Sequence, residues 1–413
     1  MLLAVILAII GLSILVFFHE FGHFLAAKLF GVSVEEFSFG YPPRICGWVW
    51  VKKKIGWLKY LWLWICYILK KIPQRPQREI SRFNFFWGKN VPPETQGKTI
   101  YSINWVPFGG LNKLKGEFGE AEKDSFTGQI WWKKALIGVG GPALNIILAI
   151  LIFSLCLAVG SPRALDEPLN GGKILRTIGI QVGWVSGQSP AEKAGLKAGD
   201  VILEVDGQIF TQITDIQNYI GQKVGQNVKI KINRRNQIFE KEMTVLPANQ
   251  VFNDSEETRG VVGIAFANTG IVAYPWYKAI LEGTKYTFAL IGNFFYGFYL
   301  IFKFLFLKQK MLGEFVGPVG MGMMIADVAQ IGFIYWLQFI GFLSVALGVF
   351  QIIPFPALDG SRIVLSIIEG IRKRPISQKT EGLIITIGFY ILILLLIIMT
   401  FKDLLRLGER LIK

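Results

Sequence analysis

The sequence has very little histidine or cysteine. Of 413 residues, only two are histidine and three are cysteine. Cys46, Cys66 and Cys156 show no paired spacing, so a disulfide or zinc-finger framework is excluded and small buried apolar side chains are favoured. The two histidines, His19 and His23, lie four residues apart. Both imidazoles of the chain therefore belong to one short segment.

Acidic residues are also scarce, since 29 Asp and Glu stand against 44 Lys and Arg. The excess is local: residues 44–134 contain 17 basic and 6 acidic residues, whereas residues 161–275 contain 12 of each. This distribution argues against nucleic-acid binding, because Lys/Arg excess marks the cytoplasmic loops of membrane proteins. It predicts that residues 44–134 and 360–380 are cytoplasmic and that the balanced middle segment lies outside.

Long apolar runs indicate the class of protein. Hydrophobic residues make up 52% of the chain and the mean hydropathy is positive, which is unusual for a soluble protein. The first run lacks a basic leading region and a small-residue cleavage site, so we expect it to be retained rather than removed as a signal peptide. Bilayer crossing needs roughly 20 apolar residues. The sequence predicts a polytopic α-helical membrane protein with spans at residues 1–30, 135–160, 328–360 and 382–401.

Two other segments are rich in aromatic residues. Residues 275–310 are expected to form an amphipathic helix at the membrane interface, with a further span over 286–307 as the alternative. Residues 48–73 mix aromatic and basic side chains, which predicts a helix lying on an anionic leaflet. Nucleic-acid stacking is the weaker alternative, because the aliphatic content is high. A polar, Pro-containing linker, "KKIPQRPQREISR", is expected to follow.

Residues 172–247 have the pattern of a soluble domain. Alternating runs such as "VILEVDG" and "NVKIKIN" predict strands, and Ser189 is a candidate N-cap of a short helix that ends at Gly195. The stretch "GWVSGQSPAEKAGLKAGDVILEVDGQ" resembles a bacterial PDZ domain. Such domains capture chain ends or strands at a sheet edge. The alternative is that this domain only gates or spaces the membrane part, without a defined peptide ligand.

The first span contains the motif "HEFGH". On a helix, His19 and His23 are separated by about 40° around the axis, so both imidazoles face one side. This is the spacing of two zinc ligands, with Glu20 beside the metal-bound water as general base. Ionisable groups inside a span are costly and usually functional, and a metal would compensate the cost. The alternative is a polar cluster that hydrogen-bonds to neighbouring helices.

A catalytic zinc site requires a third protein ligand and one open position. Asp359, in "FQIIPFPALDGSR", is the candidate, because the predicted topology puts it at the same cytoplasmic end as His19. Pro354 and Pro356 cannot continue a helix, and irregular backbone at membrane depth is tolerated only inside protein or along a cavity. An ordinary turn or helix cap is the alternative for Asp359.

These motifs together resemble the site-2 protease family of intramembrane zinc metalloproteases, in its bacterial regulator-of-sigma-E branch. "HEFGH" lies in the first span, "GGPALN" opens the second, a PDZ domain follows, and "PFPALDG" closes the third. "YSINWVPFGGLNKLKGE" and "GPVGMG" also match. The resemblance covers most of the chain except residues 48–94, which look like an insertion in the cytoplasmic region 31–134.

The resemblance implies a set of functional residues. His19, His23 and Asp359 would bind Zn²⁺, and Glu20 would be the catalytic base. Residues 100–118 would form a membrane-associated β-loop able to hold an unwound substrate strand, with Gly109 and Gly110 in it; a plain turn is the alternative for these glycines.

Three positions need separate comment. Gln351 stands where the family usually has a substrate-holding Asn, and its amide offers the same donors and acceptor on a longer arm. Ser361-Arg362 stands where the family often has Gly-His. In "GVGGPALN", the small residues favour close helix packing, and Asn145 either lines the site or only hydrogen-bonds between helices.

The sequence therefore predicts a zinc-dependent intramembrane endopeptidase that cleaves transmembrane segments of other membrane proteins. We expect a multi-pass protein of the inner membrane, with both termini and the PDZ domain outside and the active site toward the cytoplasm. Expected partners are membrane-protein substrates, membrane lipid and a peptide ligand of the PDZ domain, and not nucleic acid. The alternative is a catalytically inactive membrane scaffold that binds peptides through its PDZ domain. A transporter is disfavoured, because the sequence shows no internal repeats.

Overall fold

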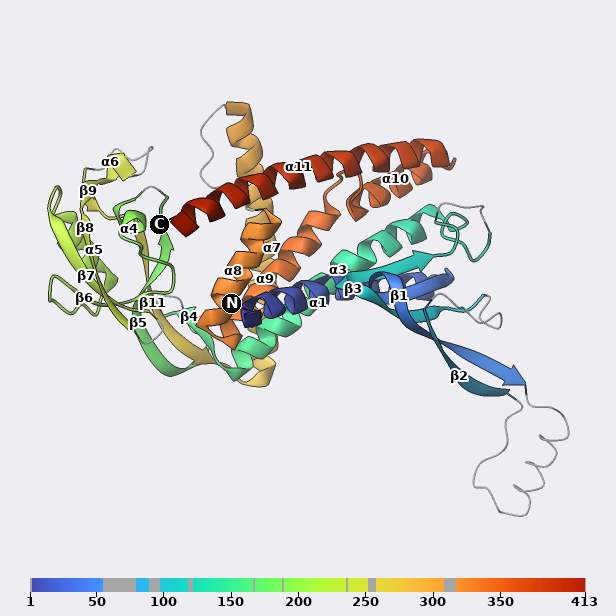
Figure 1. Cartoon of the computed structure of the whole chain (residues 1–413), viewed down its shortest axis with the longest axis horizontal. Helices are drawn as coiled ribbons and strands as arrows, with labels where there is room; N and C mark the ends of the chain where they lie inside the picture. The colour runs from blue at the N-terminus through green and yellow to red at the C-terminus, as the bar shows by residue number, and fades with distance from the viewer. Residues whose placement is uncertain are drawn as a thin grey trace, which may run out of the picture. The chain divides into compact units, whose positions relative to one another are not determined.

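The computed structural model divides the chain into two compact units. The first comprises Met1–Ile150, Thr287–Gln330 and Phe339–Lys413, and the second comprises Leu151–Tyr286 and Ile331–Gln338. Figure 1 labels most of the helices and strands of both. The structure describes residues 2–54, 79–88, 97–117, 122–165, 168–187, 189–234, 237–251, 258–307 and 317–412.

Four helices are long and apolar enough to cross a membrane in the described part of the chain. They match the four predicted apolar stretches, although the last helix is longer than residues 382–401. Two glycines bring the first two together, because a Cβ on Gly22 would overlap the carbonyl of Gly140. The four helices are α1 (Leu2–Leu29), α3 (Trp131–Val159), α9 (Phe333–Ile352) and α11 (Gln378–Ile412).

The predicted third span, residues 328–360, is wrong as one helix. Helix α8 (Pro318–Ile331) ends before Gly332, α9 ends at Ile352, and α10 (Asp359–Arg372) begins after a non-helical break. Pro354 and Pro356 explain the break, because proline lacks the N–H that a helix interior needs. Asp359 consequently starts a new helix instead of ending the third span.

The predicted interfacial segment 275–310 forms one continuous helix, α7 (Trp276–Leu307). Within the described residues it is not among the helices that meet the length and hydropathy expected of a span. Its placement at the interface stays a prediction, with a span over 286–307 as the alternative.

A three-stranded sheet lies in the first unit, with strand order β2-β1-β3. The predicted helix at 48–73 is wrong over residues 48–54, which belong to β1 and pair with β2 (Figure 1). Alternation explains the difference, since Val49 is fully buried and Trp50 is 57% exposed, as on a strand with two different faces. Residues 55–78 lie outside the described part of the chain, and the predicted linker ends inside β2. The strands are β1 (Val34–Lys54), β2 (Glu79–Trp87) and β3 (Ile100–Leu114).

The expected β-loop at 100–118 is confirmed as β structure, because β3 covers most of it. The register gives residues 36–39 two neighbours, 110–113 on one side and 100–103 on the other. No strand of the described residues pairs with the outer edge of 110–114. This half of β3 packs against α1 through a buried cluster that contains Phe24, Ala27, Phe37, Leu114 and Ile137.

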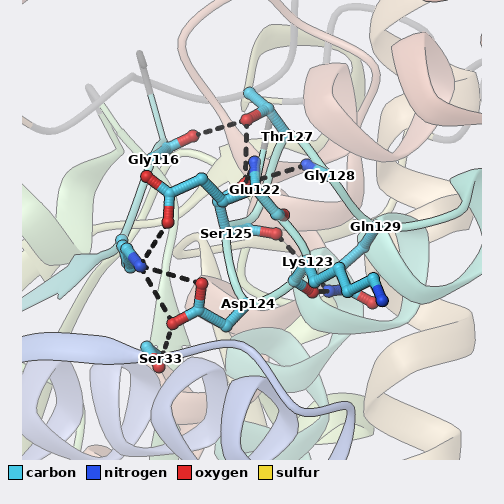
Figure 2. A network of polar contacts seen from close by, with 10 residues as sticks. Ser33, Gly116, Glu122, Lys123, Asp124, Ser125, Thr127, Gly128 and Gln129 are labelled. Carbon is cyan, nitrogen blue, oxygen red and sulfur yellow. Dashed lines mark hydrogen bonds and ion pairs between the residues drawn. The ribbon is translucent and has the colours of Figure 1, made fainter. Parts of the chain in front are cut away.

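A polar network fastens the loop after β3 (Figure 2). Lys115 Nζ lies 2.8 Å from Asp124 Oδ1 and 2.6 Å from Glu122 Oε2. Ser33, just after α1, donates to Asp124 Oδ2 at 3.0 Å, and its backbone N–H donates to the Asp124 carbonyl. Thr127 donates to the Gly116 carbonyl at 3.0 Å. The network thereby joins the ends of α1 and β3 to the segment that leads into α3.

The second unit contains a six-stranded sheet with strand order β4-β11-β5-β6-β7-β8. The predicted strands at "VILEVDG" and "NVKIKIN" are confirmed as β6 and β7. The sheet extends beyond the predicted limits 172–247, because β11 pairs with β5 and β4 pairs with β11. These six strands are β4 (Ser161–Ala164), β5 (Lys173–Val185), β6 (Val201–Val205), β7 (Asn227–Arg234), β8 (Gln237–Thr244) and β11 (Ile264–Ala273).

Short elements complete this unit. Ser189 is confirmed as the N-cap of α4, since its hydroxyl accepts the Glu192 N–H at 3.2 Å. Gly195 follows the helix with a φ of +77°, a conformation that favours glycine. A buried cluster including Val205, Val228 and Ile230 forms the core. The short elements are α4 (Pro190–Lys193), α5 (Ile213–Gly221), α6 (Ala248–Val251), β9 (Leu246–Pro247) and β10 (Gly260–Val261).

Candidate metal centre and active site

His19 and His23 face the same side of α1, as their spacing predicts. Their Nε2 atoms are 3.2 Å apart, and their side chains are 6% and 12% exposed. Both rings point toward α3, where a Cβ on Gly141 would overlap His23 Nε2 and lie 2.7 Å from His19 Cε1. Gly141, in the motif "GVGGPALN", therefore makes room for the imidazoles as well as for close helix packing.

Asp359 meets the two histidines from the other end of the sequence. Its Oδ2 lies 2.9 Å from His19 Nε2 and 3.1 Å from His23 Nε2. The break before α10 orients this carboxylate, and Gly360 is required there because a Cβ would overlap the Ile353 carbonyl. The alternative of an ordinary turn or cap does not account for a carboxylate directed at two buried imidazoles.

The three residues have the donor set of a zinc site. One ligand atom from each of His19, His23 and Asp359 lies within 4.8 Å of the others. Zinc bonds of about 2.0–2.1 Å in a tetrahedral site separate neighbouring ligands by roughly 3.3 Å, close to the pairwise distances of 2.9–3.2 Å. Two nitrogens and one carboxylate oxygen also leave the fourth position that a catalytic zinc needs.

Each imidazole is held through its other nitrogen. His23 Nδ1 donates to the Ile137 carbonyl at 2.8 Å, and His19 Nδ1 lies 3.3 Å from the Asn145 amide nitrogen. Such contacts orient metal-binding histidines and select their tautomer. Asn145 is fully buried on α3, so it both hydrogen-bonds between helices and contacts the site.

Glu20 lies on a different face of α1, about 100° from His19 around the helix axis. It faces β3, where a Cβ on Gly110 would lie 3.3 Å from Glu20 Cγ. Gly109 has a φ of +77°, and a Cβ there would lie 2.7 Å from Val16 Cγ1. The two glycines are therefore part of a strand that approaches α1 closely, and the alternative of a plain turn is wrong.

A cavity of about 620 Å³ brings the candidate residues together. Gln351, at the end of α9, lines it as the sequence suggested, and its Oε1 is buried without a hydrogen-bond partner. Of the eight residues proposed from the sequence, Gly109 and Asn145 adjoin the cavity without lining it. The six that line it are His19, Glu20, His23, Gly110, Gln351 and Asp359.

Sequence reasoning missed several polar residues of the cavity, among them Asn112, Glu117 and Arg362. The sequence marks Arg362 only as a departure from the family pattern, yet its guanidinium forms an ion pair with Glu117 at 2.5 Å. Burial alone would lower the pKa of Arg362, but Glu117 and Asp359 raise it above the usual value. Asn112 could have been found, because every second residue of a strand faces the same side as Gly110.

Comparisons with known proteins show which family the chain resembles. The model of peptidase family M50 matches residues 7–63 and 74–395. A relative in Clostridium acetobutylicum, which bears the name of a zinc metalloprotease, is 28% identical over 97% of this chain and 96% of its own length. The regulator of sigma-W protease RasP of Bacillus subtilis is 26% identical over 98% of each chain.

Solved structures of PDZ domains are similar to about a fifth of the chain. The crystallised PDZ domain of an SdrC-like protein from Listeria innocua is 36% identical and covers 21% of this chain and 92% of its own, with a TM-score of 0.19. The PDZ interpretation therefore rests on the motif at residues 183–208.

Proposed function

Because the chain belongs to peptidase family M50, the site-2 proteases, and is a zinc metalloendopeptidase of that type, we propose that it cleaves transmembrane segments of other proteins. In this proposal His19, His23 and Asp359 are the zinc ligands, and Glu20 is the catalytic base. One observation carries the assignment: residues more than 330 positions apart direct their ligand atoms to within 4.8 Å of one another. Glu20 lines the same cavity, which favours hydrolysis over a non-catalytic scaffold.

The chemistry follows from the residues around the cavity. His19, His23 and Asp359 would hold the zinc ion, which would acidify a bound water and polarise the scissile carbonyl. The Glu20 carboxylate takes the proton of the attacking water and passes one to the leaving amine. Asn145 and the Ile137 carbonyl keep the imidazoles in position during these transfers.

The substrate is proposed to bind in an extended conformation. A helical segment hides its peptide bonds in its own hydrogen bonds, so it must unwind before attack. The outer edge of residues 110–114 offers main-chain groups to which an unwound segment can pair. Gly110 brings this edge next to Glu20, so the paired segment would pass the base.

The orientation in the membrane is also part of the proposal. The protein is a multi-pass membrane protein of the inner membrane. The excess of Lys and Arg over Asp and Glu in residues 44–134 and 360–380 supports an active site that opens toward the cytoplasm. The PDZ-like domain would then lie outside, where it would gate the protease or dock substrates by strand addition.

The decisive experiment compares variants in cleavage of a model single-pass membrane substrate, with zinc measured on the same preparations. Glu20→Gln should abolish cleavage and keep zinc, because only the proton-transfer group is removed. His23→Ala and Asp359→Ala should lose both zinc and cleavage.

Glu35→Gln is the matched control, because Glu35 is an exposed carboxylate paired with Lys113. It should match the wild-type protein in both measurements. Undiminished cleavage by Glu20→Gln would refute the mechanism, and full zinc occupancy in Asp359→Ala would refute the third ligand.

A further inference from the structure

Asn112 lies on the face of β3 that lines the active-site cavity. Residues 110, 112 and 114 alternate onto the same side of the strand, and all three line the cavity. Asn112 pairs with Phe37 across the sheet, so the backbone position of its side chain is set by the β1–β3 register. Its carboxamide therefore belongs to the cavity wall.

The Asn112 carboxamide is buried and lacks partners. Neither its Nδ2 nor its Oδ1 has a hydrogen bond, a condition that no other side-chain amide shares in the part of the chain that the structure describes. Gln351 Oε1, from α9, is buried without a partner in the same cavity. Buried polar groups are nearly always paired, because leaving them unpaired is costly. Two such amides in one cavity point to a ligand that pairs with both.

A peptide main chain fits these groups. A carboxamide has an N–H donor and a carbonyl acceptor, and so complements one peptide unit of an extended chain. Gly110 lies against Glu20, and Asn112 follows it by roughly 7 Å along the strand, at about 3.3 Å per residue. A substrate strand lying along this edge would therefore present to Asn112 a peptide unit about two residues from the bond beside Glu20.

We propose that Asn112 is a substrate-binding residue whose carboxamide, together with that of Gln351, binds the main chain of the extended substrate. This inference rests on the proposed protease function and adds a sequence preference to it. Asn112 needs a substrate N–H to accept, and proline has none. The substrate position facing Asn112 therefore disfavours proline.

Asn112→Leu tests the proposal, because leucine has a similar volume and no polar atoms. We expect kcat/KM for the model substrate to fall about 10- to 100-fold, the loss expected for two hydrogen bonds. Zinc content should not change. The thermal unfolding temperature should stay the same or rise, because an unpaired buried amide is replaced by an apolar side chain. Asn293→Leu is the control, since it makes the same substitution at an exposed asparagine of α7, away from the cavity.

A proline scan of the substrate supplies a second readout. Proline at one substrate position, about two residues from the scissile bond, should lower kcat/KM of the wild-type protein by about tenfold more than it lowers kcat/KM of Asn112→Leu. At the other positions the two proteins should show equal penalties. Equal penalties at every position would refute the contact between Asn112 and the substrate main chain.

A measurement of substrate binding tests this inference independently of the protease function on which it rests. In the Glu20→Gln background, Asn112→Leu should weaken binding of the uncleaved, fluorescently labelled substrate about tenfold. This result would support a contact between Asn112 and the substrate even if no variant cleaved it. Absence of cleavage in every variant and in the wild-type protein would instead contradict the proposed function. Wild-type affinity in the double variant, or a lowered unfolding temperature in Asn112→Leu, would identify Asn112 as a structural residue and overturn the inference.

Discussion

The amide nitrogen of Asn145 lies 3.3 Å from Nδ1 of His19, whose Nε2 faces Asp359 at 2.9 Å. Metal binding through Nε2 requires the proton to sit on Nδ1, so the carboxamide must then present its oxygen. A half-turn of the Asn145 side chain provides this, because its two ends are nearly the same size. In that orientation the Asn145 oxygen accepts the Nδ1 proton and favours the His19 tautomer that can bind zinc.

Asn145→Leu should accordingly weaken zinc binding about 10- to 100-fold, the usual cost of losing an outer contact to a ligand histidine. Competition with a chelator measures this change. Ile147→Ala, a change at an exposed position of the same helix, should leave zinc affinity unaltered. Wild-type affinity in Asn145→Leu would show that Asn145 serves helix packing alone.

Gly141→Ala should abolish zinc binding and cleavage, because its Cβ would overlap His23 Nε2. The loss should occur although alanine favours helix more than glycine by about 1 kcal/mol. Metal analysis and the cleavage assay together test this. The matched control is Gly292→Ala in α7, where a Cβ meets nothing within 4 Å and no loss is expected.

Removing one partner of the ion pair between Lys134 and Glu369 should destabilise the fold, because the side chains are only 9% and 14% exposed and the other charge would stay buried. Its N–O distance is 2.9 Å and it ties α3 to α10, the helix that begins at Asp359. Lys134→Met should lower the free energy of unfolding by about 3 kcal/mol, since it leaves a buried charge unpaired. Denaturant unfolding in detergent measures the change.

Two controls define this result. The free energy of unfolding should fall less in the double variant Lys134→Met/Glu369→Leu than in Lys134→Met alone, because no buried charge remains unpaired. Glu35→Gln, which breaks an exposed pair, should cost less than about 1 kcal/mol. A loss in Lys134→Met no larger than in Glu35→Gln would contradict the role assigned to the buried pair.

The loop of Figure 2 should loosen in acid. Hydrogen bonds from Lys115 and Ser33 lower the pKa of Asp124 below its ordinary value of about 3.9. The ionised form is therefore the one that stabilises the fold, fully above about pH 4 and progressively less as the pH falls through the lowered pKa. Hydrogen-exchange protection of the peptide containing Ser33 should decrease over that range.

Asp124→Asn is the matched variant for the acid effect. Its protection should be lower at neutral pH and should not change with acidification, because the titrating carboxylate is absent. The same pH dependence in both proteins would assign the loosening to another group.

The sequence by itself determined the chemistry and the class of fold. Four apolar runs predict membrane-spanning helices, and a helical spacing of four predicts that His19 and His23 share a face, because both properties are local. The predicted topology made Asp359 the candidate third ligand, and the resemblance to the site-2 proteases supported it, although no local pattern links Asp359 to the histidines. The same local reasoning failed at residues 48–54, where aromatic and basic content suggested a helix and pairing with β2 produced a strand.

Only the tertiary structure decided which groups meet in the cavity. The break at Pro354 and Pro356 made Asp359 the start of α10, and the bend of β3 brought Asn112 beside the site. Such contacts depend on register and helix crossing, which are properties of the packed whole and not of any segment. The chemistry of the site is thus visible in two short motifs, and its substrate-binding wall emerges only when distant elements pack.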